Sequence, residues 1–295
     1  MTSVAVGQAF FVLTYTGLAL TIFSLGSTLT IARSKSKPIA EWYSCCAAAI
    51  VLAGSFGLLV GKFDTISRDM IVATNTCRTQ AAIIYASPTL APLTFAMLLL
   101  KSILSVRYHF APHSSRRKRT ISLATMLLPW VVYFVLLAVF TKEVIQNPDG
   151  VSLSTAGTHC HVSNQKLQRL SLTAAFCAMV VNSCLGGYIC VLLYRSGTAL
   201  KEAGGELQNA KSMSVRFAFL SGTILVLTIC LLVFQAVFSQ FKGNGAYELT
   251  VAILSFIFGM VFFTRKDILI AWLEVFRNIG VSAGRRGGLP VPLMF

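Results

Sequence analysis

The chain has 295 residues, of which 55% are hydrophobic and only 12% are charged, and its formal net charge is +15. A soluble domain carries about 25% charged residues, so this composition excludes a water-soluble globular protein. With a mean hydropathy of +0.73, the sequence predicts an integral membrane protein.

Seven apolar stretches free of Lys, Arg, Asp and Glu follow one another, and most reach the roughly 20 residues that a membrane-spanning helix needs. They cover residues 8–32, 42–61, 79–100, 120–141, 170–194, 217–241 and 249–264. The seventh would span only about 24 Å at 1.5 Å per residue, so we expect it to begin near Ala246 and to bring Glu248 into the outer mouth. We therefore predict an all-α, seven-transmembrane helix bundle that forms one domain over residues 1–278.

The distribution of basic residues predicts the orientation of this bundle. Eighteen of the 25 lysines and arginines lie in the gaps after the odd-numbered spans and after the seventh. Basic residues mark the cytoplasmic side, so we expect the N-terminus outside and the C-terminus inside. Glu41 is among the few acids that we assign to this basic inner face. The first apolar run is too long for a signal peptide and has no basic residue before it, which predicts a retained span.

Two further segments follow the seventh span. Residues 267–277 carry an acid at their start, a basic residue at their end and interfacial aromatic residues, which predicts a short eighth helix lying on the membrane surface. Residues 279–295 are rich in Gly and Pro, and we expect a flexible cytoplasmic tail.

The predicted topology separates the eight cysteines into two groups. Six lie within spans, where cysteine behaves as a small apolar residue. Cys77, at the outer end of the third span, and Cys160, in the outer loop of residues 142–169, face the oxidising side. We predict a disulfide between them that holds this loop over the mouth of the bundle; the alternative is two free thiols.

Chemistry of other kinds finds little support in the sequence. His159 and His161 flank Cys160 and could join its thiolate in a metal site. However, Cys160 is expected in the disulfide, and no other metal ligand is evident. None of the four histidines lies in a span, and the seventh span has no lysine for a retinal Schiff base, since Lys266 follows it. We expect no enzyme activity, no metal and no cofactor.

The stretch "CRTQAAIIYASPTLAPLTFAMLLLKSILSVRYHF", together with the seven spans and the two outer cysteines, resembles G-protein-coupled receptors, in particular the orphan seven-helix receptor-like proteins of mushrooms and other fungi. The resemblance implies a plasma-membrane receptor that signals to a heterotrimeric G protein. Arg107 and Tyr108 stand near the inner end of the third span without the acid that usually precedes them in that superfamily.

The resemblance also implies a ligand-lining face on the third span. Counted from Cys77, the residues on that face include Gln80, Ile84, Tyr85 and Pro88. With His161 and Glu248 they form the candidate ligand site, which suits a neutral or apolar ligand; plain helix packing is the alternative. Pro88 and Pro92 are expected to kink the helix, either as a hinge or as a static bend.

The basic inner face supplies a candidate docking surface for a cytosolic partner, although its charge also suits anionic lipid. Nucleic acid is not needed to explain this charge, and the sequence leaves the oligomeric state open. Two other functions remain: a facilitative transporter or channel for a neutral solute, and a non-signalling membrane scaffold. The candidate docking residues are Lys101, Arg107, Tyr108, Arg116, Arg117, Lys118 and Arg119.

Overall fold

The structure, a computed structural model, describes most of the first five predicted spans and the seventh. The described residues are 3–32, 40–58, 74–109, 115–154, 159–162, 164–195 and 246–263, with Gly222 and Val226 as single positions. The predicted sixth span, the predicted eighth helix and the predicted tail lie outside the described residues, apart from those two positions.

The described part of the chain is mostly helical, as predicted. The helices are α1 (Ser3–Ala32), α2 (Ala40–Gly57), α4 (Asn75–His109), α5 (Ser115–Gln146), α6 (Gln165–Arg195) and α9 (Ala246–Phe263). Each matches one predicted span, and α9 begins at Ala246 as expected. Most helices run several residues past the apolar stretch, because a helix continues through the interface until its backbone groups reach water or a cap.

Four of the described helices are long and apolar enough to cross a membrane, so a membrane protein is plausible from the structure as well as from the composition. The candidate spans are Gly7–Leu29, Asn75–Leu104, Thr120–Gln146 and Lys166–Leu192. The described parts of α2 and α9 have 18 residues each. They would cover about 27 Å, slightly less than a hydrocarbon core of about 30 Å.

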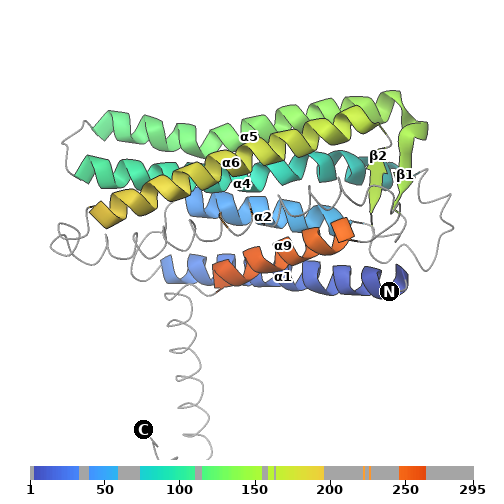
Figure 1. Ribbon diagram of the computed structural model, residues 1–295, viewed down its shortest axis with the longest axis horizontal. Coiled ribbons are helices and arrows are strands. Elements are labelled where there is room, and N and C mark those ends of the chain that lie inside the picture. Colours follow the sequence, from blue (N-terminus) through green and yellow to red (C-terminus); the bar gives the residue numbers. More distant parts are fainter. Residues whose placement is uncertain are drawn as a thin grey trace, which may run out of the picture.

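The helices lie side by side in a bundle with α4 at its centre (Figure 1). α4 packs against α2, α5 and α6, while α2 also packs against α1, and α1 packs against α9. The start of α1 lies at the same end of the bundle as a small β-hairpin, and we call this the hairpin end (Figure 1). The opposite end, where α2 and α5 begin and α4 and α6 end, is the far end.

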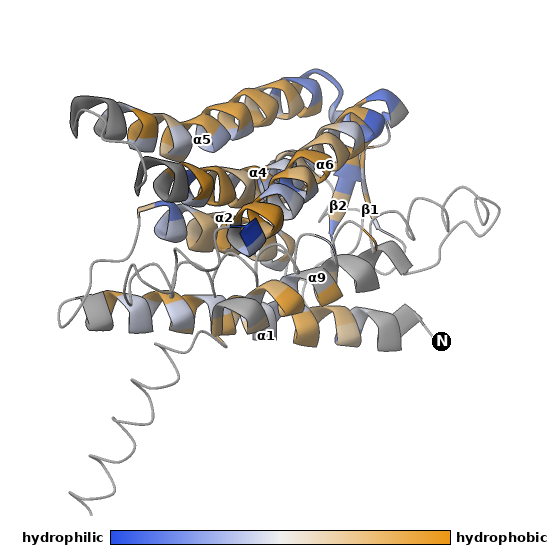
Figure 2. Cartoon of the chain, turned by 60° about the vertical axis from the view of Figure 1, so that its left-hand side comes forward, coloured by the Kyte–Doolittle hydropathy of each residue, from blue (hydrophilic) through white to orange (hydrophobic). Residues whose placement is uncertain are grey.

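The outward surface of the bundle is apolar. Along α5, Val131, Phe134 and Val135 are all more than half exposed, and Figure 2 shows hydrophobic colouring over most of this helix. Such a continuous exposed apolar face suits lipid rather than water. On α1, Thr16 and Ser27 donate their hydroxyl groups to backbone carbonyls one turn earlier, which satisfies these polar atoms inside their own helix.

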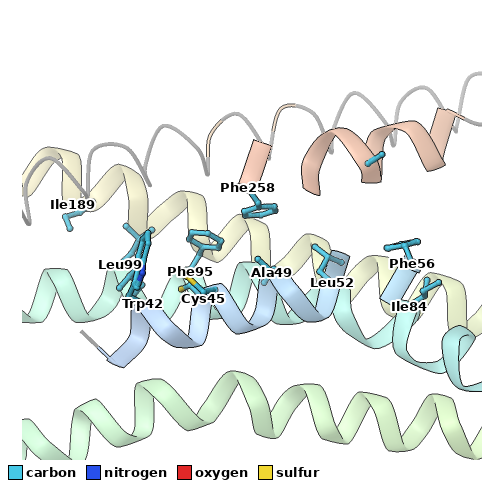
Figure 3. Packing of buried hydrophobic residues seen from close by; sticks show 14 of the residues in the cluster. Trp42, Cys45, Ala49, Leu52, Phe56, Ile84, Phe95, Leu99, Ile189 and Phe258 are labelled. Atoms are coloured by element: carbon cyan, nitrogen blue, oxygen red, sulfur yellow. The ribbon is translucent and has the colours of Figure 1, made fainter. Parts of the chain in front are cut away.

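The main apolar core lies between α2, α4, α6 and α9. Phe95 of α4 stacks on Phe258 of α9 with ring centroids 5.2 Å apart, and Trp42 and Cys45 of α2 pack into the same cluster (Figure 3). Because α4 and α9 lie far apart in the sequence, this contact joins the first half of the chain to its second half. Cys45 and Cys46 are buried in this core and form no disulfide, while Cys177, Cys184 and Cys190 of α6 are exposed.

The α1–α9 interface depends on two glycines. A Cβ atom at Gly17 would overlap the carbonyl of Ser255, and one at Gly259 would overlap the backbone of Gly17. The two helix backbones therefore touch directly, as small residues permit in membrane bundles. The sequence analysis did not single out this pair, because 242 residues separate the two glycines in the chain.

One element departs from the all-α prediction. Within the predicted outer loop, β1 (Val151–Leu153) and β2 (Cys160–Val162) pair antiparallel, with Val151 opposite Val162 and Leu153 opposite Cys160. A short 3-10 turn at Pro148–Gly150 leads from α5 into β1. The hairpin is stable only because one face packs on the bundle, since an isolated two-stranded hairpin is marginal in water.

Candidate functional site

The hairpin is fastened to the central helix by the predicted disulfide. Cys77 in the first turn of α4 is bonded to Cys160 in β2, with 5.5 Å between their Cα atoms. Both side chains are fully buried, and Val151 and Val162 of the hairpin are buried beside them. This prediction is confirmed, and Cys160 is consequently not available as a metal ligand. Across the described part of the chain, no group of three or more metal-ligating side chains occurs.

Gln80, one turn below the disulfide, ties three elements together. Its Nε2 donates to the carbonyl oxygens of Ser55 at 3.0 Å and Phe56 at 3.3 Å, near the end of α2. Its Oε1 accepts the backbone N–H of Cys160 at 3.1 Å. The last carbonyls of a helix have no partner within that helix, so this amide caps α2 while holding the hairpin. Gln80 has no exposed surface, and both ends of its amide are hydrogen-bonded to backbone groups of the protein.

His159 fills the space between the hairpin and α2. It is 5% exposed, its ring meets Phe56 edge to face with 5.6 Å between centroids, and its carbonyl accepts the backbone N–H of Ser154 at 2.8 Å. Burial, together with the smaller effect of the nearby His161, lowers the pKa of His159 from the usual 6.5 to about 4. The imidazole is therefore neutral at physiological pH and packs between the hairpin and Phe56 of α2.

The outer side of the hairpin carries polar contacts. His161 is half-buried, and its Nε2 lies 3.0 Å from the hydroxyl oxygen of Ser152 on the opposite strand. At the exit of the hairpin, Glu143 of α5 accepts hydrogen bonds from the amides of Asn147 at 2.9 Å and Asn164 at 2.8 Å. These contacts join the two ends of the connection between α5 and α6 to the last turns of α5.

The remaining residues of the predicted ligand face point in two directions. Ile84 is 2% exposed and packs beside Phe56 toward α2 (Figure 3). Tyr85 is half-buried, and its ring lies 5.7 Å from that of Phe140 on α5. Pro88 is half-buried on α4, and the sixth member, Glu248, belongs to the first turn of α9. The structure thus joins Gln80 to the hairpin, packs Ile84 toward α2 and directs Tyr85 toward α5.

The prolines of α4 change its hydrogen bonding near the middle. Pro88 and Pro92 lie inside the helix, and a proline leaves the carbonyl four residues earlier without its helical donor. The hydroxyl of Ser87 lies 3.5 Å from the freed carbonyl of Ile84. One residue further, the hydroxyl of Ser171 on α6 donates to the carbonyl of Tyr85 at 2.6 Å. α6 is thereby hydrogen-bonded to α4 just above the prolines.

The far end of the bundle holds a polar cluster that sequence reasoning missed. The sequence places Glu41 among the acids of the basic inner face, and the structure adds that this carboxylate is buried, at 2% exposure. Its Oε1 accepts the hydroxyls of Ser122 at 2.9 Å and Thr125 at 3.2 Å from α5, and lies 3.4 Å from Nζ of Lys101 on α4. We call these four residues the Glu41 cluster.

The two oxygens of the Glu41 carboxylate differ in their hydrogen-bond partners. Oε1 of Glu41 has three partners, whereas its buried Oε2 has no hydrogen-bond partner among the residues that the structure describes. One turn further along α2, Ser44 accepts the indole N–H of Trp130 from α5 at 2.9 Å. Polar groups therefore link the far end of α2 to α4 and α5, beside the buried apolar packing of Trp42 against Leu99. The signal in the sequence was an acid placed directly before an apolar span, with a lysine at the matching depth of another span.

The predicted docking residues occupy the same end of the bundle. Lys101 is 22% exposed at its side chain and pairs with Glu41, so it belongs to the cluster as well as to the predicted surface. Arg107 and Tyr108 lie in the last turn of α4, and residues 116–119 lie in the first turns of α5. The fold therefore brings the two basic segments to a common end.

Comparison with known proteins gives no assignment: no family model matches the chain, and no curated protein matches it either.

Proposed function

We propose that this chain is a seven-helix receptor of the plasma membrane, with the hairpin end outside and the far end in the cytosol. It binds an extracellular neutral or apolar ligand and signals to a cytosolic partner, a heterotrimeric G protein. The predicted sixth span lies outside the described residues. We place the chain with the G-protein-coupled receptors on its predicted topology and its outer disulfide.

The observation that carries this proposal is the attachment of the hairpin to α4. The hairpin is held by a disulfide to Cys77 and by a hydrogen bond to Gln80, and α4 packs against α2, α5 and α6. A ligand that binds one arrangement of the hairpin better than another shifts the population of α4 positions by its difference in affinity. The central helix then carries that shift to the far end.

The chemistry of the hairpin end supports a ligand without charge. The groups there include a neutral imidazole at His159, hydroxyls such as that of Ser152, and buried apolar side chains. The carboxylate of Glu143 at the exit of the hairpin is already bonded to two amides. Ligand sites are mostly apolar with a few polar groups that fix orientation. Tyr85 and Pro88, which are half-buried, and His161 on the hairpin are the proposed contacts, with Glu248 at the start of α9.

A reporter assay tests the proposal directly. The chain, with a luciferase at its C-terminus, is expressed in cells together with a panel of fluorescent Gα subunits, and a library of neutral small molecules is added outside. The expected result is energy transfer to at least one Gα that depends on an added compound and is lost in Cys77→Ser at equal surface expression. An N-terminal epitope tag that antibodies reach on intact cells checks the orientation.

The contrary outcome is also measurable. Purified protein is reconstituted into liposomes, and swelling is followed after addition of small neutral solutes such as urea and glycerol. Solute flux in these liposomes, with no Gα recruited by any compound in cells, would overturn the receptor proposal in favour of a facilitative transporter.

A further inference from the structure

We infer that the Glu41 cluster is a two-state switch that controls the spacing of the far ends of α2, α4 and α5. Its open state exposes the cytosolic ends of these helices to a partner. The use of this opening by a cytosolic partner rests on the proposed function, whereas the opening itself does not.

First, the carboxylate of Glu41 is buried at the far end of the bundle. Glu41 is 2% exposed, so a charge on it requires a partner inside the protein, and Lys101 is that partner at 3.4 Å. Removing one member of a buried ion pair leaves an uncompensated charge, which is strongly unfavourable. The pair can therefore separate only if water reaches Glu41, and this requires the far ends of the helices to move apart.

The second step concerns the partner that can leave. The Lys101 side chain is 22% exposed, and a lysine near a helix end can extend its amino group to the membrane surface. Lys101 thus has a second position in water that costs it little. Glu41 also has unused acceptor capacity at Oε2, so the closed arrangement does not saturate the carboxylate.

The third step is the contrast between the two ends of α4. At the hairpin end, α4 is fixed by the disulfide, by the three hydrogen bonds of Gln80 and by the bond from Ser171 to the Tyr85 carbonyl. At the far end, the polar attachments of α4 among the described residues are the Lys101–Glu41 pair and its neighbours, beside the buried apolar contacts of Leu98, Leu99 and Ile103. Pro88 and Pro92 lie between these ends, where the helix has lost backbone hydrogen bonds and bends most easily.

These observations together describe a helix anchored at one end, weakened in the middle and held at the other end by an ion pair next to apolar packing. From Glu41 to Ser55, the cluster lies about 21 Å along α2 from the residues that anchor the hairpin. An opening of the cluster therefore moves the part of α4 below the prolines while the hairpin end stays in place.

Hydrogen exchange on the full chain in lipid nanodiscs tests this switch. The variants are Lys101→Met, which keeps the apolar stem, and Glu41→Gln, which keeps an acceptor for Ser122 and Thr125. The matched control is Glu143→Gln, which changes the carboxylate that accepts two hydrogen bonds at the hairpin end. Exchange is followed by mass spectrometry in peptides from residues 98–109 and 77–86.

We expect both cluster variants to speed exchange in residues 98–109 by at least about tenfold and to leave residues 77–86 unchanged, because only the far end opens. The control should leave residues 98–109 unchanged. Thiol labelling of Cys77 only after reduction confirms that each variant is folded. If either variant fails to fold, it is replaced by the double variant Ser122→Ala and Thr125→Val. This double variant leaves the charges of Glu41 and Lys101 in place.

The inference is overturned if residues 98–109 exchange at the wild-type rate in the variants, or if both ends of α4 lose protection equally. The Gα reporter then separates this inference from the proposed function. Faster exchange with raised basal recruitment supports both. Faster exchange without recruitment of any Gα supports the switch and contradicts the G-protein receptor.

Discussion

Gln80→Leu is the substitution that tests the hairpin anchor most directly. Leucine has nearly the same size and suits a buried site, so the change removes hydrogen bonds without leaving a large cavity. It leaves three buried backbone groups without their present partner: the carbonyls of Ser55 and Phe56 and the N–H of Cys160.

The expected loss of stability follows from these three groups. An orphaned buried donor or acceptor costs about 1–3 kcal/mol, and the gain from burying leucine offsets part of the sum. The two carbonyls lie at a helix end where water can reach them after a small movement, so we expect a net loss of about 2–4 kcal/mol. For a chain of this size, such a loss lowers Tm by roughly 5–10 °C.

The assay is thermal unfolding of purified protein in mild detergent, with Asn182→Leu as the matched control. Asn182 is also a buried amide on a helix, at 4% exposure, but its Oδ1 has no hydrogen-bond partner. Its replacement should be neutral or slightly stabilising. The anchoring role of Gln80 is refuted if the Tm of Gln80→Leu lies within about 1 °C of the wild-type Tm. It is also refuted if Asn182→Leu lowers Tm as much as Gln80→Leu does.

Three other predictions concern the disulfide, a buried histidine and a glycine contact. Cys77→Ser opens a loop of sequence separation 83 and should lower stability by about 4 kcal/mol on the chain-entropy model; an impermeant maleimide should label wild type only after reduction. Burial lowers the pKa of His159 to about 4, so between pH 6.5 and 4 the unfolded chain binds a proton that the folded chain does not. Stability should therefore fall by about 3 kcal/mol over that interval as pH drops, and His159→Phe should flatten this part of the Tm profile, whereas an unchanged slope would contradict the assignment. Gly259→Ala forces a Cβ against the backbone of Gly17 and should cost about 1–3 kcal/mol, while Gly26→Ala, which meets nothing within 4 Å, should not lower Tm; equal effects of the two alanines would refute the close contact.

Composition and charge pattern were sufficient for the class of protein and for the places of the helices that the structure describes. An apolar run of about 20 residues can satisfy its backbone in lipid only as a helix, so the position of α5 or α6 follows from local sequence. The disulfide was also predictable, because topology left Cys77 and Cys160 as the two cysteines outside the apolar spans.

The tertiary structure decided how polar groups within those helices are used. Gln80 was predicted to face a ligand, but its three partners come from α2 and from the hairpin, over separations of 24 to 80 residues. Glu41 was assigned to the basic inner face, and only the structure shows that Lys101 of α4 and two hydroxyls of α5 surround its carboxylate. No local pattern encodes such contacts, since they depend on which helices become neighbours and at what depth, and that is set by packing over the whole bundle.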